Sequence, residues 1–271
     1  MFSPEDAKAA FDLTADFVRD NPRRDAGTEC GKAAARWLAD RISAAGGKAR
    51  LDCFRAMSPD GMREFVNLYC AFERRPGTPW TVLVSHYDTK PGTGCPGAND
   101  GASTSGLLIG LANAFSNWRE PKGNLMLVWT DGEECMRNYG PNDGFWGSKR
   151  AAEYLEGKNR EVQAVICVDM LGDRDLDISI PSNGSPTLAK IALHAAKRVG
   201  CPELVKLGNE LVKDDHVAFM EKGFKAIDLI DFNYGPSNSH WHTPQDTMDK
   251  VSEESLLKSG RVVAEMLNIL L

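Results

Sequence analysis

The sequence predicts an α/β protein, a three-layer αβα sandwich around a mixed, mostly parallel central sheet. Two patterns support this fold. Several segments of strand length are near-continuous apolar runs (TVLVS, NLMLVWT, AVICV and KAIDLI), as expected of strands covered by helices on both faces. Segments with helical spacing alternate with these runs in the second half of the chain. No stretch of the 271 residues resembles a long linker, so we expect a single domain, residues 1–271.

The first part of the chain predicts two helices followed by strands. Ser3, Pro4 and the acidic pair Glu5 and Asp6 form a helix-start signal, and apolar residues at helical spacing continue it to about residue 18. A second helix covers about residues 28–45 and stops at the glycine pair 46–47. We expect strands at residues 49–54, 65–72 and 81–85, and then a helix rich in small residues at 101–115.

The rest of the chain alternates between strands and helices. Strands are expected at residues 125–130, 164–168 and 225–230. Helices are expected at residues 146–155, 185–199, 215–222 and 253–271. This alternation is typical of a sheet whose strands are mainly parallel.

Composition and charge exclude several classes of protein. The chain is 42% hydrophobic and 26% charged, and its formal net charge of −6 comes without a basic block, so we expect no nucleic-acid partner. No apolar run approaches the roughly 20 residues that span a bilayer. The 7 cysteines lack the paired spacing of a disulfide framework or a thiolate zinc site. No signal peptide is visible, and the location stays open, including an extracytoplasmic one after removal of a leader.

Acidic residues and a histidine follow four of the apolar runs at the point where each strand ends. They are His86 and Asp88 after the first run, Asp131, Glu133 and Glu134 after the second, Asp169 after the third and Asp231 after the fourth. In open α/β sheets, ligands bind beyond the carboxyl ends of the strands. We therefore expect these side chains to converge on one rim of the sheet.

Five residues form a set with the nitrogen and oxygen donors that zinc accepts. They are His86, Asp100, Glu134, Asp169 and His242. Two zinc ions about 3.5 to 4 Å apart need a shared carboxylate plus an imidazole and an acid for each ion, and Asp100 is the candidate bridge. A single acid after a strand is more often a helix cap or a solvated loop residue, and this explanation stays open for Asp88 and Asp131. For the whole set it is weaker, because burying five such groups without a cation costs several kcal/mol for each.

The other histidines are weaker candidates for metal ligands. His194 falls on the apolar face of an expected helix, which favours a packed or surface role. His240 lies two residues before His242 in an expected loop, so both need not face the site. His216 follows an expected helix start, and we expect it to cap the helix or to support a ligand from behind.

The loops contain three further candidates. Trp241 and Tyr139 are flanked by polar loop residues, which favours the wall of a substrate pocket over the core. The run PGTGCPGANDGAS lacks the lysine and hydroxyl ending of a phosphate-binding loop, so we expect its backbone to bend closely around a metal ligand. Cys95 within this run has no base beside it in the sequence that would make it a nucleophile.

Six motifs in order resemble the zinc exopeptidase family that contains bacterial leucyl aminopeptidase and glutaminyl-peptide cyclotransferase. They are SHYDTK, GANDGAS, WTDGEEC, CVDMLGD, DDHVAFMEKG and WHTPQDTMDKV, between residues 85 and 251. The resemblance implies the zinc-dependent exopeptidase (phosphorylase/hydrolase-like) fold. It also implies that Asp100, Glu134 and His242 hold one zinc ion, and that His86, Asp169 and again Asp100 hold a second ion if one is bound. Glu133 falls on the position of the family's general base.

Several features are similar to the glutaminyl cyclase-like bacterial branch of this family. These are the long segment EECMRNYGPNDGFWGSKR, the motif HYDTK, the acid Asp214 and the residue Trp241. The cyclase pattern implies a proton relay of Glu133, Asp169 and Asp214, with Trp241 lining the glutamine pocket. Two positions depart from that pattern, because Asp228 stands where the cyclases have histidine and Tyr139 stands where a pocket tryptophan is expected. The segments HTPQDTMDKV and AIDLIDF fit the general peptidase pattern at least as well.

The sequence therefore predicts a zinc enzyme that acts on peptide N-termini. We assign Glu133, Asp88 and Asp214 to catalysis, and Trp241, Tyr139 and Asp228 to substrate binding. The first expectation is a metallo-aminopeptidase that releases the N-terminal residue with metal-activated water. The alternative is a glutaminyl-peptide cyclotransferase that forms pyroglutamate with loss of ammonia, and the remote alternative is a catalytically silent scaffold. We expect a monomer that binds a peptide with a free N-terminus.

Overall fold

The computed structural model describes residues 2–118, 121–158 and 160–271, and in them one 8-stranded sheet has the order β1-β2-β4-β3-β5-β8-β6-β7. The strands are β1 (Ala49–Ser58), β2 (Gly61–Phe72), β3 (Trp80–His86), β4 (Asn124–Thr130), β5 (Val162–Asp169), β6 (Ile178–Ile180), β7 (Val205–Leu207) and β8 (Ala226–Ile230). The four central strands β4, β3, β5 and β8 run parallel to one another. The outer strands β1 and β2 are antiparallel, as is the pairing of β6 with β8.

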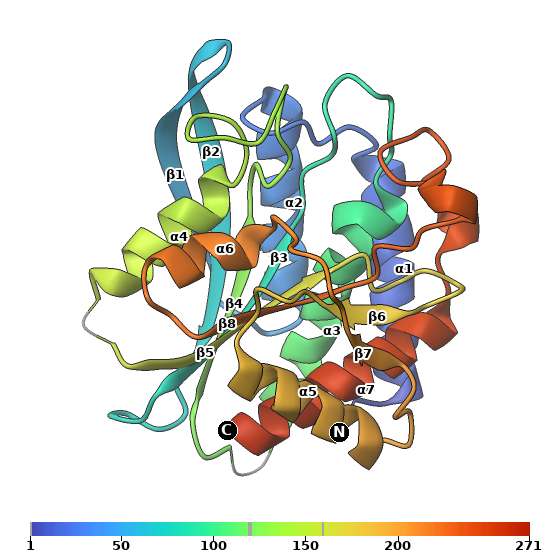
Figure 1. The fold of residues 1–271 in the computed structure, drawn as a ribbon. Helices are drawn as coiled ribbons and strands as arrows, with labels where there is room; N and C mark the ends of the chain where they lie inside the picture. Colours follow the sequence, from blue (N-terminus) through green and yellow to red (C-terminus); the bar gives the residue numbers. More distant parts are fainter. Residues whose placement is uncertain (1, 119–120, 159) are drawn as a thin grey trace.

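Helices cover both faces of this sheet, so the predicted three-layer α/β sandwich is confirmed (Figure 1). The helices are α1 (Pro4–Asp20), α2 (Glu29–Ala44), α3 (Thr104–Ser116), α4 (Trp146–Glu156), α5 (Pro186–Arg198), α6 (Asp215–Glu221) and α7 (Glu253–Leu270). The helices α4 and α6 lie on one face, and α1, α2, α3, α5 and α7 lie on the other.

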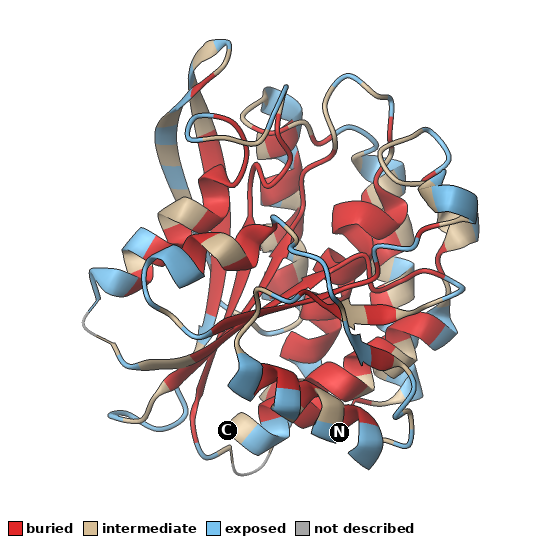
Figure 2. Cartoon of the chain, in the orientation of Figure 1, coloured by how far each residue is buried: buried red, intermediate tan, exposed pale blue. Residues whose placement is uncertain are grey.

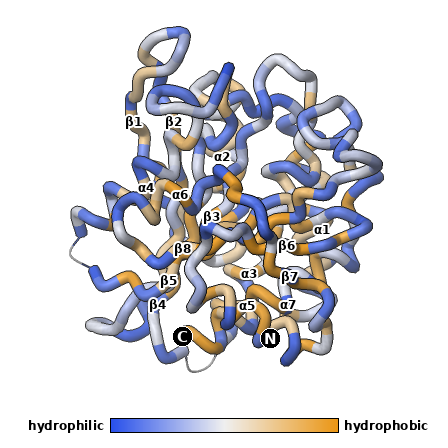
Figure 3. The backbone as a smooth tube through the Cα atoms, viewed as in Figure 1, coloured by the Kyte–Doolittle hydropathy of each residue, from blue (hydrophilic) through white to orange (hydrophobic). Residues whose placement is uncertain are grey.

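The alternation of side chains along the central strands supplies a core on each side of the sheet. On β3, Leu83 packs into the larger cluster with α1, α3 and α7, whereas Val82 and Val84 pack against α4 and α6. All of β3 and β4 is buried, as Figure 2 shows for the central strands. Hydrophobic residues concentrate in the interior of the molecule, and hydrophilic residues concentrate on the outer loops (Figure 3). This pattern explains why the central strands are near-continuous apolar runs.

The structure differs from the predicted elements in three ways. The strands β1 and β2 extend to Ser58 and Gly61 and form one long hairpin. The helix expected from residue 101 begins at Thr104, because Gly101 has a φ of 87° and an irregular turn, Ala98–Ser103, precedes it. The strands β6 and β7 were not predicted, since each has only 3 residues and no apolar run of its own.

The parallel arrangement brings the ends of four strands to one edge. His86 ends β3, Thr130 ends β4, Asp169 ends β5 and Ile230 ends β8, and these strands are consecutive parallel neighbours. Their carboxyl ends therefore lie side by side, where ligands bind in open α/β sheets. Among the helices in the described part of the chain, we find none with the length and apolar character needed to cross a membrane.

Candidate metal centre and active site

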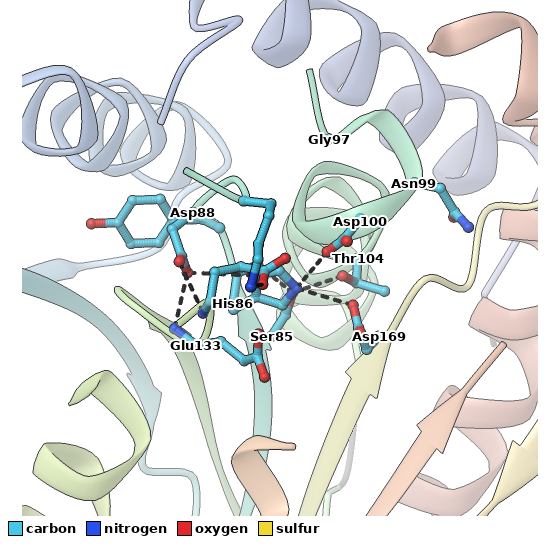
Figure 4. Close-up of polar contacts among 12 residues, drawn as sticks. Ser85, His86, Asp88, Gly97, Asn99, Asp100, Thr104, Glu133 and Asp169 are labelled. Atoms are coloured by element: carbon cyan, nitrogen blue, oxygen red, sulfur yellow. Dashed lines mark hydrogen bonds and ion pairs between the residues drawn. The ribbon is translucent and has the colours of Figure 1, made fainter. Parts of the chain in front are cut away.

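Two groups of possible metal ligands lie at this edge of the sheet and share Asp100. In the first group, His86 Nε2 lies 3.2 Å from Asp100 Oδ1 and 3.1 Å from Asp169 Oδ1. In the second, His242 Nε2 lies 3.4 Å from Asp100 Oδ2 and 2.7 Å from Glu134 Oε1. Within each group, three ligand atoms lie within 4.8 Å of one another. One oxygen of Asp100 thus faces each group, which is the arrangement that a bridging carboxylate requires (Figure 4 shows the first group).

The polar atoms in these groups fit a cation. Among the described residues, Asp100 Oδ2 and Glu134 Oε1 are buried and have no hydrogen-bond partner. Asp100 is 4% exposed and Glu134 is 1% exposed. Buried carboxylate oxygens without donors are strongly destabilising unless a cation pairs with them. The donor set of two imidazoles and three carboxylates matches the ligands that zinc accepts.

Local backbone geometry brings Asp100 next to His86. Gly101 has a positive φ, and a Cβ there would lie 2.9 Å from the Asp88 carbonyl oxygen and 3.0 Å from His86 Cε1. A residue with a side chain would therefore push the loop away from the imidazole. The carboxylate of Asp246 accepts hydrogen bonds from the backbone N–H groups of Asn99 and Asp100, at 2.7 and 3.1 Å. These contacts fix the turn that carries Asp100.

Asp88 supports both sides of the site from behind. Its carboxylate is fully buried and accepts hydrogen bonds from the backbone N–H groups of Glu133 and Glu134, both at 3.1 Å. Its Oδ1 also lies 3.4 Å from His86 Nδ1 (Figure 4). Asp88 thus contacts both the His86 imidazole and the backbone of the double-glutamate turn. The helix-cap explanation does not describe Asp88.

Glu133 lies beside these groups but belongs to neither. It is 5% exposed and lines a cavity of about 360 Å³. Burial, together with the nearby carboxylates of Glu134 and Asp214, raises the pKa of Glu133 well above its usual range. A carboxylate next to a ligand but outside the ligand groups can exchange protons with a bound molecule.

The cavity beside Glu133 contains most of the predicted substrate-binding residues. It is lined by Asp100, Glu133, Glu134, Tyr139, Asp169, Glu210, Leu211, Val212, Lys213, Asp214, Ile230, Phe232, Trp241 and His242. Trp241 and Tyr139 therefore lie where the sequence predicted a pocket wall. Asp228 differs, because it is fully buried on β8 and is not among the lining residues. A direct contact between Asp228 and a ligand does not follow from this position.

Asp228 instead belongs to a third buried cluster, with Asp214 and His216. Within the described residues, neither carboxylate oxygen of Asp228 has a hydrogen-bond partner. Burial, together with the Asp214 and Asp169 carboxylates, raises the pKa of Asp228 well above its usual range. His216 follows the cap residue Asp214 on α6 and its Nε2 lies 3.0 Å from Asn183 Nδ2. A supporting role for His216 stays a prediction, and the structure adds that its ring lies in the cluster with Asp214 and Asp228.

Of the two histidines near residue 241, the structure directs only His242 to the site. His242 has a φ of 57°, and its ring stacks on Trp241 at a centroid distance of 3.9 Å. His240 packs edge-on against Tyr234 at 5.3 Å instead. A non-glycine residue with positive φ is uncommon and typical of functional sites. His194 does not belong to any of the three groups formed by the described residues.

Other acids and the cysteines lie outside these groups. Asp131 is fully buried and accepts a hydrogen bond from the backbone N–H of Val66 at 2.9 Å. Asp231 accepts hydrogen bonds from the backbone N–H groups of Asp177 and Asn233, so it organises a loop. The 7 cysteines form no disulfide bonds with one another in the structure.

Arg24 was missed by the sequence analysis. It is fully buried, and its guanidinium donates hydrogen bonds to the carbonyl oxygens of Asn21, Tyr87, Pro96 and Gly97, at 2.7 to 3.0 Å. It thus ties the loop between β3 and the Asp100 turn to the segment before α2. The pair Arg23 and Arg24 resembles an isolated surface pair in the sequence, so no local signal distinguishes the buried member.

Comparisons with known proteins agree with this fold and geometry. Residues 67–267 match peptidase family M28. A glutaminyl-peptide cyclotransferase-like protein from Bos taurus is 27% identical over 258 residues, covering 84% of this chain and 66% of the relative. The chain spans 54% to 66% of the length of the curated relatives matched first.

Solved structures match over nearly the whole chain. A crystal structure of an Acidobacteriales bacterium glutaminyl cyclase is 30% identical, with a TM-score of 0.90, and covers 98% of this chain and 94% of that one. A leucine aminopeptidase precursor from Bacteroides thetaiotaomicron is 23% identical, with a TM-score of 0.87 and coverage of 98% and 97%, and shows the same fold. The resemblance to zinc exopeptidases inferred from the motifs is confirmed by these matches.

Proposed function

The chain belongs to peptidase family M28, and on this premise we propose that it is a glutaminyl-peptide cyclotransferase, which converts the N-terminal glutamine of a peptide to pyroglutamate. The observation that carries the proposal is the likeness to the Acidobacteriales glutaminyl cyclase along nearly the whole chain. The curated relatives matched first include glutaminyl-peptide cyclotransferases as well. The aminopeptidase that the sequence put first has less support from these names.

We assign a zinc ion to Asp100, Glu134 and His242, and a second position to His86, Asp100 and Asp169. The assignment rests on the two groups of ligand atoms and on the buried carboxylate oxygens described above. When bound, zinc supplies a Lewis acid that polarises the carbonyl of the substrate's γ-amide.

Side chains of the protein would transfer the protons in the cyclisation. Glu133 accepts a proton from the α-amine of the substrate, and the amine nitrogen then bonds to the γ-amide carbon. The bond between that carbon and the amide nitrogen breaks, and Glu133 returns the proton to the leaving nitrogen, which departs as ammonia. Asp88 keeps the Glu133 backbone in place through its hydrogen bond. Trp241 and Phe232, whose rings lie 4.9 Å apart on the cavity wall, offer an apolar surface to the substrate.

A second candidate function is peptide hydrolysis by an aminopeptidase. The observation that favours it is the completeness of both ligand groups around Asp100, because paired metal ions are a recurrent feature of aminopeptidases. In this reaction Glu133 would take a proton from water instead of from the substrate amine. The two reactions differ in whether water or the substrate's own amine attacks the carbonyl.

One experiment separates the two candidates. The zinc-loaded protein is incubated with a peptide that begins Gln-Ala and with a peptide that begins Leu-Ala, and the products are identified by mass spectrometry. Loss of ammonia from the glutamine peptide alone supports cyclisation. Release of leucine from the second peptide, with an intact glutamine peptide, would overturn the proposal in favour of hydrolysis. Elemental analysis of the same sample gives the number of zinc ions for each chain.

A further inference from the structure

The hydroxyl group of Tyr139 contacts both glutamates of the site. It lies 3.3 Å from Glu133 Oε2 and 3.3 Å from Glu134 Oε2. A phenol at neutral pH carries its proton and donates one hydrogen bond, which these two oxygens share. The sequence predicted Tyr139 to line the substrate pocket, and its ring does line the cavity. Its polar end, however, is directed to the carboxylates.

The two oxygens of Glu134 have different surroundings. Oε2 faces the Tyr139 hydroxyl and the ammonium group of Lys90, which lies 3.3 Å away. Oε1 lies 2.7 Å from His242 Nε2 in an arrangement that does not form a hydrogen bond, and no other described residue donates to it. Donors of the protein thus contact Oε2 of Glu134, and Oε1 faces the other members of its ligand group. Lys90 also lies 5.3 Å from the centre of the Tyr139 ring, so the two donors support each other.

The loop that carries Tyr139 is held by an internal network. The carboxylate of Asp143 accepts hydrogen bonds from the backbone N–H groups of Met136, Arg137 and Asn138, at 2.6 to 2.8 Å. Lys149 donates to the carbonyl oxygens of Gly140 and Gly144, at 3.1 and 3.0 Å. Every one of these bonds lies within residues 136–149. The loop therefore has a defined shape that does not depend on a bound substrate.

Packing then fixes the direction of the Tyr139 ring. The ring stacks on Phe145, with centroids 4.6 Å apart and an interplanar angle of 15°. Gly144 has a φ of 84°, and a Cβ at this position would lie 2.6 Å from Tyr139 Cδ1. Only glycine leaves room for the ring in this position. The hydroxyl is thereby delivered to the glutamates by a preformed structure.

We propose that Tyr139 is a positioning residue, whose hydroxyl holds the Glu133 carboxylate toward the cavity and occupies Glu134 Oε2, so that Glu134 offers only Oε1 to the metal ion. The inference rests on the proposed function, in which Glu134 is a ligand and Glu133 is the base. Without the hydroxyl, Glu134 gains freedom to bind the ion through both oxygens and Glu133 loses a hydrogen bond that restrains it. Mutation of a group that holds a metal ligand in this way typically lowers activity or metal affinity by about 10- to 100-fold.

The test compares Tyr139→Phe with Tyr154→Phe. The first variant removes the hydroxyl and keeps the ring that stacks on Phe145. The matched control removes a hydroxyl from Tyr154 on α4, which is not among the cavity-lining residues. Steady-state kinetics with a Gln-Ala peptide give kcat and KM, and the visible absorption of the Co²⁺-substituted protein reports the coordination of the ion.

We expect Tyr139→Phe to lower kcat by about 10-fold or more with KM changed by less than about twofold, and to alter the Co²⁺ spectrum. The control should match the wild type in both readouts. Gly144→Ala, which displaces the ring and keeps the hydroxyl, should change kcat and the spectrum in the same direction as Tyr139→Phe. An unchanged kcat and an unchanged spectrum in Tyr139→Phe would overturn the inference.

The two proposals fail in different ways. If the wild type turns over neither the glutamine nor the leucine peptide, the proposed function fails, and the Co²⁺ spectra still test the contact between Tyr139 and Glu134. If the wild type cyclises the glutamine peptide and Tyr139→Phe does so equally well with the same spectrum, only the positioning role is refuted.

Discussion

Replacing Arg24 by methionine tests whether one buried cation holds the loops of the site together. The guanidinium donates to four backbone carbonyl oxygens, and those of Tyr87 and Gly97 are in fully buried hydrogen bonds. Burial lowers the pKa of Arg24 to about 10, and the nearby carboxylate of Asp246 opposes this shift, so the side chain stays charged at neutral pH. Methionine replaces the unbranched stem of arginine with a shorter apolar chain and provides no donor.

The magnitude follows from the acceptors that lose their donor. A buried acceptor without a partner costs about 1–3 kcal/mol, so the two buried carbonyls give about 2–6 kcal/mol. Removing a desolvated charge offsets part of this cost. We expect the free energy of unfolding to fall by about 3 kcal/mol, out of the roughly 5–15 kcal/mol typical of a folded protein.

Urea unfolding of the metal-free protein measures this loss without a contribution from zinc binding. Arg23→Met is the matched control, since the Arg23 side chain is 77% exposed and its substitution should change the free energy of unfolding by less than about 0.5 kcal/mol. Arg24→Lys should be intermediate, because lysine has three donors for four carbonyls. A loss below about 1 kcal/mol in Arg24→Met would refute the reasoning.

Three further predictions concern the reaction, the metal and pH. Glu133→Gln should retain zinc in elemental analysis and lower kcat by about 10²- to 10⁴-fold, and preserved turnover would contradict its role as base. Asp100→Asn should lose zinc during dialysis that leaves the wild type loaded, because Asp100 is shared by both ligand groups. Burial raises the pKa of Asp231 from 3.8 to about 7, so its stabilising contribution is present at low pH and is lost as the pH rises through about 7. Asp231→Asn cannot titrate, and its stability relative to the wild type should therefore increase between pH 4 and about 7 in urea unfolding; a constant difference would contradict the shift.

The side chains of the candidate site could be predicted because they follow strands. The apolar runs identify β3, β4, β5 and β8, and the residue types just after them are visible in the sequence. Once these strands are parallel neighbours, His86, Glu134 and Asp169 must lie at one edge. Asp100 and His242 come from loops, so no strand end places them beside the other three.

The supporting residues could not be predicted in this way. Arg24 and Asp246 are far in the sequence from Asp100, whose turn they hold, and the local sequence pattern around each does not reveal this contact. The strands β6 and β7 are too short to produce a periodic signal. Asp228 lies within an apolar strand, two residues before its end. Its full burial depends on the packing of β8 against β5, which the sequence pattern does not show.

The sequence by itself determined the α/β class, the succession of the central strands and helices along the chain, and the chemical character of the site. These depend on local periodicity and on residue type. The tertiary structure decided how the two oxygens of Asp100 are shared and that the Tyr139 hydroxyl reaches the glutamates. The physical reason is that these features depend on contacts between segments distant in the chain, and on backbone dihedrals at positions such as Gly101, Gly144 and His242.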